Sequence, residues 1–110
     1  MPPEVLPLGS FNPYRIIQSR VDPPTPVVIS CPHAGRVYPT EFVDQLSLEV
    51  RQLRTLEDFA MDQLVQDSFA SSGHFDCLIN NVARAYIDVN RPADALVCRR
   101  CLQVLSCREC

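Results

Sequence analysis

The sequence predicts an α/β fold built from strand–helix–strand units. Residues 27–31 form a short apolar run that is typical of a strand buried on both faces, and residues 56–70 place apolar side chains at helical spacing. Residues 75–89 return to strand-like patterns. A strand, a helix and a strand in this order favour a parallel connection. With 110 residues the chain is at most one domain, which excludes a large two-lobed enzyme.

The composition argues against some classes of binding partner. Apolar residues make up 46% of the chain, charged residues 21%, and the net charge is -3, which is typical of a soluble globular protein and argues against a nucleic-acid surface. No apolar run reaches the roughly 18 residues that a membrane span needs, and the N-terminus lacks the basic and apolar pattern of a signal peptide. We therefore expect a cytoplasmic protein with no nucleic-acid or membrane partner. The oligomeric state does not follow from the sequence.

The first predicted element is a proline-rich arm over residues 1–26. This segment holds seven of the ten prolines and shows no sustained periodicity, so we expect an extended arm on the surface. The core is expected to begin with the strand over residues 27–31, which Pro32 and the loop up to Gly35 then end.

Two helical segments are expected next. A weak one covers residues 46–53, and a stronger one runs from Leu56 to about Ala70. Thr55 could cap the stronger helix, which would place Asp58 in its first turn. Gly73 is expected to end it in a left-handed conformation.

The last part of the predicted domain, residues 75–89, supplies one or two further strands with a kink or turn at Asn80-Asn81. From residue 84 to 90, polar side chains occupy the even positions and apolar ones the odd positions, which predicts a strand with one polar face that ends before Pro92. Asn90 and Arg91 would lie at its tip. An amide beside a guanidinium suits a carboxylate ligand, although a solvated strand end explains the same residues.

These polar residues are expected to meet at one edge of the sheet. In a parallel strand–helix–strand unit, the carboxyl ends of the strands and the start of the helix share an edge, which would gather His33, Asp58 and the pair Asn90-Arg91. If a hairpin at Asn80-Asn81 instead made Cys77-Leu78-Ile79 the parallel strand, residues 84–90 would run antiparallel and that pair would lie at the opposite edge. An exposed loop histidine and a helix-capping acid are the simpler alternatives. Arg84 ranks lower, because a regular strand puts it about 20 Å from Asn90 unless the chain bends.

The six cysteines fall into two groups. Cys31 and Cys77 lie in apolar runs and are expected to be inert core residues. The other four form two C-x-x-C pairs with five residues between the pairs: Cys98, Cys101, Cys107 and Cys110. Structural zinc sites usually leave about 12 to 20 residues between such pairs, so a tail without metal is favoured over a zinc site.

Together, the motifs resemble the N-terminal half of the N-formylglutamate amidohydrolase family over about residues 26–96. They are Pro32-His33-Ala34-Gly35-Arg36, then Leu56-Glu57-Asp58 with Asp62-Gln63-Leu64, and then Arg84 with Tyr86-Ile87-Asp88-Val89-Asn90-Arg91-Pro92. The resemblance implies part of a three-layer α/β fold with a mixed sheet, of the zinc carboxypeptidase-like type. It also implies a divalent metal, with zinc as the expected one, and hydrolysis of an N-formyl or other N-acyl amide on an acidic amino acid to formate and glutamate.

The resemblance assigns a role to five residues. His33 and Asp58 would be metal ligands. Asn90 and Arg91 would bind a carboxylate of the small-molecule substrate, and Arg84 would assist them. No catalytic acid or base is assigned.

Two departures from the family pattern bear on activity. Carboxypeptidases place a glutamate ligand three residues after the histidine, whereas Arg36 stands there in this chain. Family members are also longer, and their downstream half is expected to bring a further histidine and a general base. The sequence therefore divides into the arm 1–26, a partial domain 27–96 and a divergent Cys-rich tail 97–110. We expect a truncated or frame-shifted hydrolase, weak or inactive as this chain; the alternative is a non-catalytic remnant or a small anion- or zinc-binding module.

Overall fold

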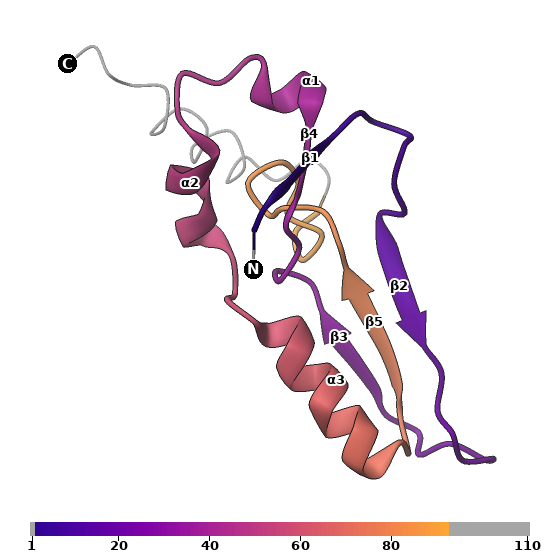
Figure 1. Ribbon diagram of the computed structural model, residues 1–110. Coiled ribbons are helices and arrows are strands. Elements are labelled where there is room, and N and C mark those ends of the chain that lie inside the picture. Colours follow the sequence, from indigo (N-terminus) through magenta and orange to yellow (C-terminus); the bar gives the residue numbers. More distant parts are fainter. Residues whose placement is uncertain (1, 93–110) are drawn as a thin grey trace.

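A computed structural model describes residues 2–92 and shows a small α/β arrangement of mixed sheets and helices (Figure 1). The α/β class is therefore confirmed. None of the helices in the described part of the chain is long and apolar enough to span a bilayer.

The larger sheet has three strands, β2 (Tyr14–Ile17), β3 (Val28–Cys31) and β5 (Asp76–Asn80), in the order β2-β5-β3. The central strand β5 runs parallel to β3 and antiparallel to β2. The strand predicted over residues 27–31 is confirmed as β3, but the prediction that it is buried on both faces is wrong, because Val28 is 67% exposed. The parallel partner of this strand, β5, includes Cys77 to Ile79, as the hairpin alternative proposed. Residues 84–90 do not form the second strand of that hairpin, because the antiparallel neighbour of β5 is β2, from the N-terminal arm.

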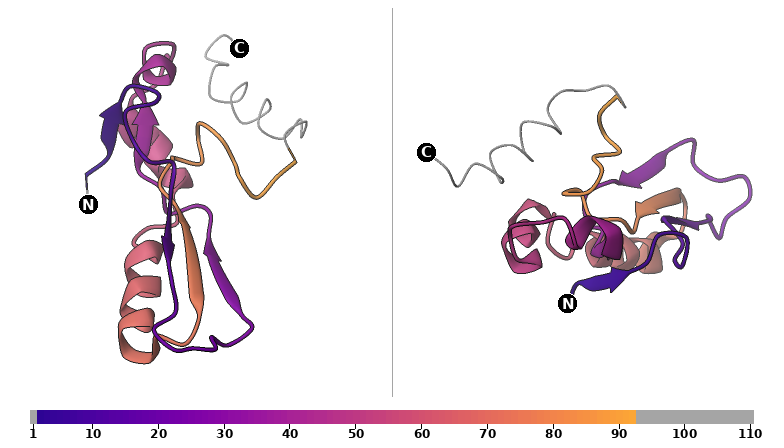
Figure 2. Two further views of the ribbon diagram at one scale, coloured as in Figure 1. Left: turned by 90° about the vertical axis from the view of Figure 1, so that its right-hand side faces the viewer. Right: turned by 90° about the horizontal axis from the view of Figure 1, so that it is seen from above.

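Helix α3 (Met61–Ser72) covers one face of this sheet (Figure 2). Side chains alternate along strands, so only every second strand residue faces the helix. The buried cluster between helix and sheet consists of Cys31, Ala34, Val65, Cys77 and Ile79. Cys31 and Cys77 are 3% and 1% exposed, which confirms the prediction that they are core residues. Burial raises the pKa of both thiols.

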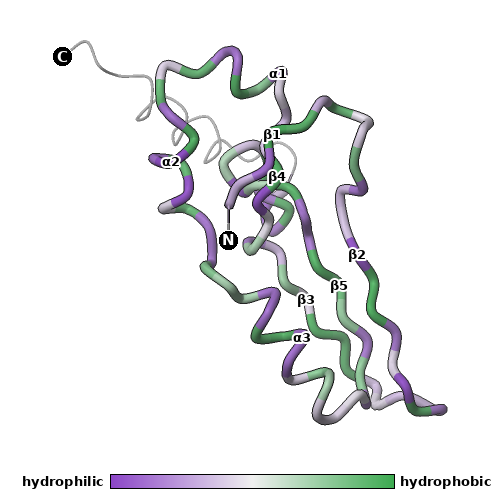
Figure 3. The backbone as a smooth tube through the Cα atoms, viewed as in Figure 1, coloured by the Kyte–Doolittle hydropathy of each residue, from purple (hydrophilic) through white to green (hydrophobic). Residues whose placement is uncertain are grey.

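The other face of the sheet has no cover among residues 2–92. Ile16, Val28 and Leu78 point to this face, with exposed fractions of 61%, 67% and 41%. The hydropathy-coloured trace shows apolar residues along all three strands (Figure 3). The sheet is therefore apolar on both faces but buried on only one.

A second, smaller unit adjoins the sheet. Strand β1 (Glu4–Leu6) pairs in parallel with β4 (Val37–Pro39), and three short helices follow: α1 (Thr40–Val43), α2 (Val50–Leu53) and the 3-10 helix η1 (Arg54–Leu56). Its buried residues are Tyr38, Leu53, Ala83 and Ala85. The proline-rich arm thus contributes one strand to each sheet, which the sequence analysis did not predict.

The prediction of a strand over residues 84–90 is wrong. The chain turns there instead, with the backbone N–H groups of Tyr86 and Ile87 both donating to the carbonyl of Ala83. The physical reason lies in Asp88, whose carboxylate accepts hydrogen bonds from side chain and backbone groups on several sides and so holds the segment in a bend. Of the apolar positions in the alternating pattern, Ala85 is buried in the smaller core, whereas Ile87 and Val89 are exposed.

The helix predicted from Leu56 starts later, at Met61. Thr55 does not cap it, because its hydroxyl donates to the carbonyl of Gln52. Asp58 lies in the loop before the helix, where its backbone N–H donates to the carbonyl of His33 at 2.9 Å. The predicted end at Gly73 is confirmed, with a left-handed φ of 63°.

The weak helix predicted over residues 46–53 is only partly right. The structure forms α2 over Val50–Leu53, whose start is fixed by reciprocal hydrogen bonds between Glu49 and Gln52. Helix α1, Thr40–Val43, was not predicted.

Candidate metal and carboxylate site

The imidazole of His33 lies between two carboxylates. His33 follows β3 in a loop and is only 9% exposed. Its Nε2 is 2.8 Å from Oδ1 of Asp88, and its Nδ1 is 3.7 Å from Oδ2 of Asp58. The structure thus brings together His33 and Asp58, the two residues for which the family resemblance implied metal ligation.

Asp88 orients this imidazole. Its carboxylate also accepts hydrogen bonds from Nε of Arg84 at 3.2 Å and from the backbone N–H of Asn90 at 2.9 Å. Burial alone would raise the pKa of Asp88, but the hydrogen bonds from His33 and Asn90 outweigh it and hold the pKa below its ordinary value. An ionised carboxylate only accepts hydrogen bonds, so Nε2 of His33 donates to Asp88, while Nδ1 faces Asp58.

The separation between His33 and Asp58 fits two ligands of one metal ion. At 3.7 Å, Nδ1 and Oδ2 are too far apart for a hydrogen bond. Two ligands at about 2.0–2.2 Å from a tetrahedral zinc ion lie roughly 3.4 Å apart. Asp58 has a half-exposed side chain, so the space beside it opens to solvent. Within residues 2–92, no third His, Cys, Asp or Glu side chain completes the group.

Two of the three residues assigned to the substrate carboxylate, Arg84 and Asn90, contact the carboxylate of Asp88. Arg84 is engaged with Asp88, and Asn90 contacts it through its backbone. Nη1 of Arg91 donates to the carbonyl of Asn90 at 2.9 Å, and both residues are exposed. The separation of about 20 Å between Arg84 and Asn90 applies only to a regular strand, and the chain bends here.

The loop that carries Asp58 is held by a buried network that the sequence analysis missed. The hydroxyl of Tyr38, which is fully buried, donates to Glu57 at 2.6 Å, and Nε of Arg54 donates to the same carboxylate at 3.2 Å. Burial, together with the hydrogen bond to Glu57, raises the pKa of Tyr38. No local pattern signals this contact, because Tyr38 lies in a strand far from Glu57 in the sequence.

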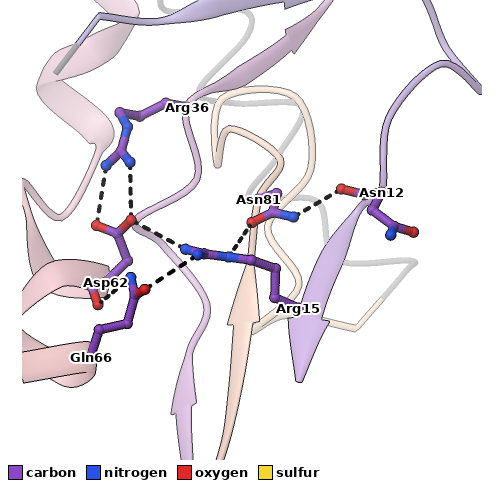
Figure 4. Close-up of polar contacts among 6 residues, drawn as sticks. All are labelled: Asn12, Arg15, Arg36, Asp62, Gln66 and Asn81. Carbon is purple, nitrogen blue, oxygen red and sulfur yellow. Dashed lines mark hydrogen bonds and ion pairs between the residues drawn. The ribbon is translucent and has the colours of Figure 1, made fainter. Parts of the chain in front are cut away.

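Asp62 lies apart from the group formed by His33, Asp58 and Asp88. It is 3% exposed and accepts two hydrogen bonds from Arg36, at 3.1 and 3.0 Å, and one from Arg15 at 3.4 Å (Figure 4). Burial would raise its pKa, but the hydrogen bonds and charge of Arg36 lower it below the ordinary value. Arg36, which stands where carboxypeptidases have a glutamate ligand, therefore pairs with a buried acid.

The four cysteines of the predicted tail, Cys98, Cys101, Cys107 and Cys110, lie outside the described residues. Their capacity to bind zinc stays a prediction.

Comparison with known proteins supports the motif-based assignment. The family model of N-formylglutamate amidohydrolase (FGase) matches residues 25–102. This range includes His33, Asp58 and Asp88 and extends past the expected limit at Leu96. No curated protein and no solved structure matches the chain. The family match covers well over half of the sequence, and the chain belongs to the N-formylglutamate amidohydrolase family.

Proposed function

We propose that this chain carries part of the active site of a metal-dependent amidohydrolase that cleaves the N-formyl or another N-acyl amide of an acidic amino acid. The observation that supports this proposal is the placement of His33, with Nε2 bonded to Asp88 at 2.8 Å and Nδ1 facing Asp58 at 3.7 Å. Metal-ligating histidines typically donate their second ring N–H to a carboxylate in this way. The family supplies the reaction class.

Each residue then has a distinct task. His33 and Asp58 would hold a divalent metal such as zinc, and Asp88 would fix the tautomer of His33. When bound, the metal would supply a water of lowered pKa and polarise the scissile carbonyl. Arg91 and Asn90 would hold a substrate carboxylate, and Arg84, already bound to Asp88, would stiffen their turn.

We expect weak turnover or none from this chain. The described residues supply two metal ligands, whereas catalytic zinc usually has three protein ligands and an open position. The small α/β arrangement would correspond to one part of a larger carboxypeptidase-like fold. Robust formate release from N-formyl-glutamate would show that this part suffices.

Metal binding tests the proposal directly. We expect zinc affinity, measured by competition with a chelating dye, to fall at least about tenfold in His33→Ala and in Asp58→Asn. His74→Ala is the matched control, because His74 is the other histidine of the chain and is exposed in a loop. Unchanged affinity in His33→Ala would refute the proposed site.

A cobalt experiment separates this site from the cysteine tail. Co²⁺ bound by His33 and Asp58 has nitrogen and oxygen ligands, whereas thiolate ligation adds an intense charge-transfer band that Cys98→Ala would weaken. Metal binding that depends on Cys98 alone would favour the alternative of a small zinc-binding module. Binding that depends on His33, together with any formate release, would favour the amidohydrolase.

A further inference from the structure

A polar cavity lies beside the Asp62 carboxylate. Its volume is about 410 Å³, which is within the range of small-molecule sites. The polar side chains drawn in Figure 4 all line it: Asn12, Arg15, Arg36, Asp62, Gln66 and Asn81. Neither His33 nor Asn90-Arg91 belongs to its lining.

The guanidinium of Arg15 keeps unused donors in this cavity. Nε donates to Asn81 at 3.2 Å, Nη1 to Gln66 at 3.5 Å and Nη2 to Asp62 at 3.4 Å. A guanidinium has five N–H groups, so these three contacts hold it in one orientation and leave one N–H on each terminal nitrogen. The side chain is 41% exposed, and a ligand in the cavity can therefore reach it.

Charge in the cavity disfavours a dianion. Arg15 and Arg36 share one buried carboxylate, Asp62, so this group of three carries one excess positive charge. Glu4 also lines the cavity and acts on Arg36 through space, so the four charged side chains of the lining sum to zero. A phosphate dianion would bring two negative charges close to Asp62 and Glu4, whereas a carboxylate brings one and offers two oxygens in the geometry of a guanidinium edge.

The cavity neighbours the space beside Asp58. A smaller cavity of about 240 Å³ is lined by Asp58 and shares Ala34, Arg36 and Gln63 with the larger one. Arg36 therefore borders both the space beside Asp58 and the cavity that Arg15 lines.

We propose that Arg15, supported by Arg36, forms a subsite for the side-chain carboxylate of the acidic substrate. The inference rests on the proposed function for the identity of that substrate. It assigns the second carboxylate to a site separate from Asn90-Arg91. Asp62 acts as a positioning residue that fixes both guanidinium groups before the ligand arrives.

Binding of glutarate in the absence of metal tests this subsite. We expect the dissociation constant, measured by calorimetry or by NMR titration, to rise about tenfold in Arg15→Gln, because a charge-assisted pair is lost. Glu4→Gln is expected to bind about threefold more tightly, because a repelling charge is removed. Arg51→Gln is the control, since Arg51 is 80% exposed on α2 and lines neither cavity.

Each outcome is decisive. Glutarate binding that is undetectable in the wild type, or unchanged in both Arg15→Gln and Glu4→Gln, would overturn the subsite, and so would binding that depends on Arg91 and not on Arg15. If Arg15→Gln does not fold, Arg15→Lys and Glu4→Gln still give the test. His33→Ala should bind glutarate like the wild type while losing zinc, so a failure of the metal site and a failure of this subsite can be told apart.

Discussion

Asp88 connects more parts of the candidate site than any other single side chain described above. It contacts His33, Arg84 and the backbone of Asn90 with one carboxylate. The sequence analysis placed Asp88 on the polar face of a strand and gave it no role. Its i,i+4 spacing from Arg84 is a signal that could have identified it, because that spacing brings side chains together only when the chain turns.

Asp88→Asn should weaken zinc binding by about 10- to 100-fold without unfolding the chain. The amide can present an N–H toward Nε2, which would leave the tautomer of His33 unfixed and make Nδ1 a poorer ligand. Chelator competition measures the affinity, and circular dichroism checks the fold. Asp67→Asn, an exposed acid on α3, is the control. Equal zinc affinity in the two variants would show that Asp88 does not orient His33.

Asp62→Asn should lower the free energy of unfolding by about 3 kcal/mol near neutral pH, because two arginines lose a buried partner. The pKa of Asp62 is depressed in the folded state, so its contribution is present above the unfolded value of about 3.9 and disappears as pH falls through the lower folded pKa. Urea unfolding between about pH 7 and about pH 2 should therefore show the two proteins converging in acid. A difference that stays constant with pH would contradict this account.

At the scale of elements, the sequence predicted correctly those helix and strand features that depend on local sequence signals. Residues 27–31 and the end of the helix at Gly73 are of this kind, since a continuous apolar run and a left-handed glycine are local signals. The start of α3 and the segment 84–90 are not. Long-range contacts decide both, through the backbone bond from Asp58 to His33 and through the carboxylate of Asp88.

The residue that begins α3 has an unfavourable backbone conformation. Ala60 caps the helix with φ 55°, in the left-handed region that favours glycine. Ala60→Gly should therefore raise the free energy of unfolding by about 0.5–1 kcal/mol.

Ala70→Gly, in the last turns of the same helix, is the matched change and should lower the free energy of unfolding by about 1 kcal/mol. Thermal unfolding of both variants measures the two effects. If both changes destabilise equally, the left-handed conformation of Ala60 does not hold in solution.

At the scale of the whole molecule, the two buried clusters explain where the candidate site lies. One cluster sits under α3 and the other under the smaller β1-β4 unit, and Ala34, directly after His33, belongs to the first. The residues on the far side of the site, Arg84 to Arg91, follow directly on Ala83, which belongs to the second. The order of the motifs in the sequence indicated that His33 and the segment from Arg84 to Arg91 lie close together. The arrangement that brings them together depends on strands of the N-terminal arm, which pair with β4 and with β5. No periodicity in residues 1–26 could have predicted that pairing.

The sheet offers a test of this arrangement through two neighbouring residues on β5. Leu78 faces the side without a cover among residues 2–92 and is 41% exposed, whereas Ile79 packs under α3 and is 1% exposed. Ile79→Thr should lower the free energy of unfolding by about 2–3 kcal/mol, while Leu78→Thr should change it by less than about 0.5 kcal/mol. Leu78→Thr should also reduce self-association, measured by light scattering, because it interrupts an exposed apolar face formed with Ile16 and Val28. A large loss of stability in Leu78→Thr would instead show that this face is buried in solution.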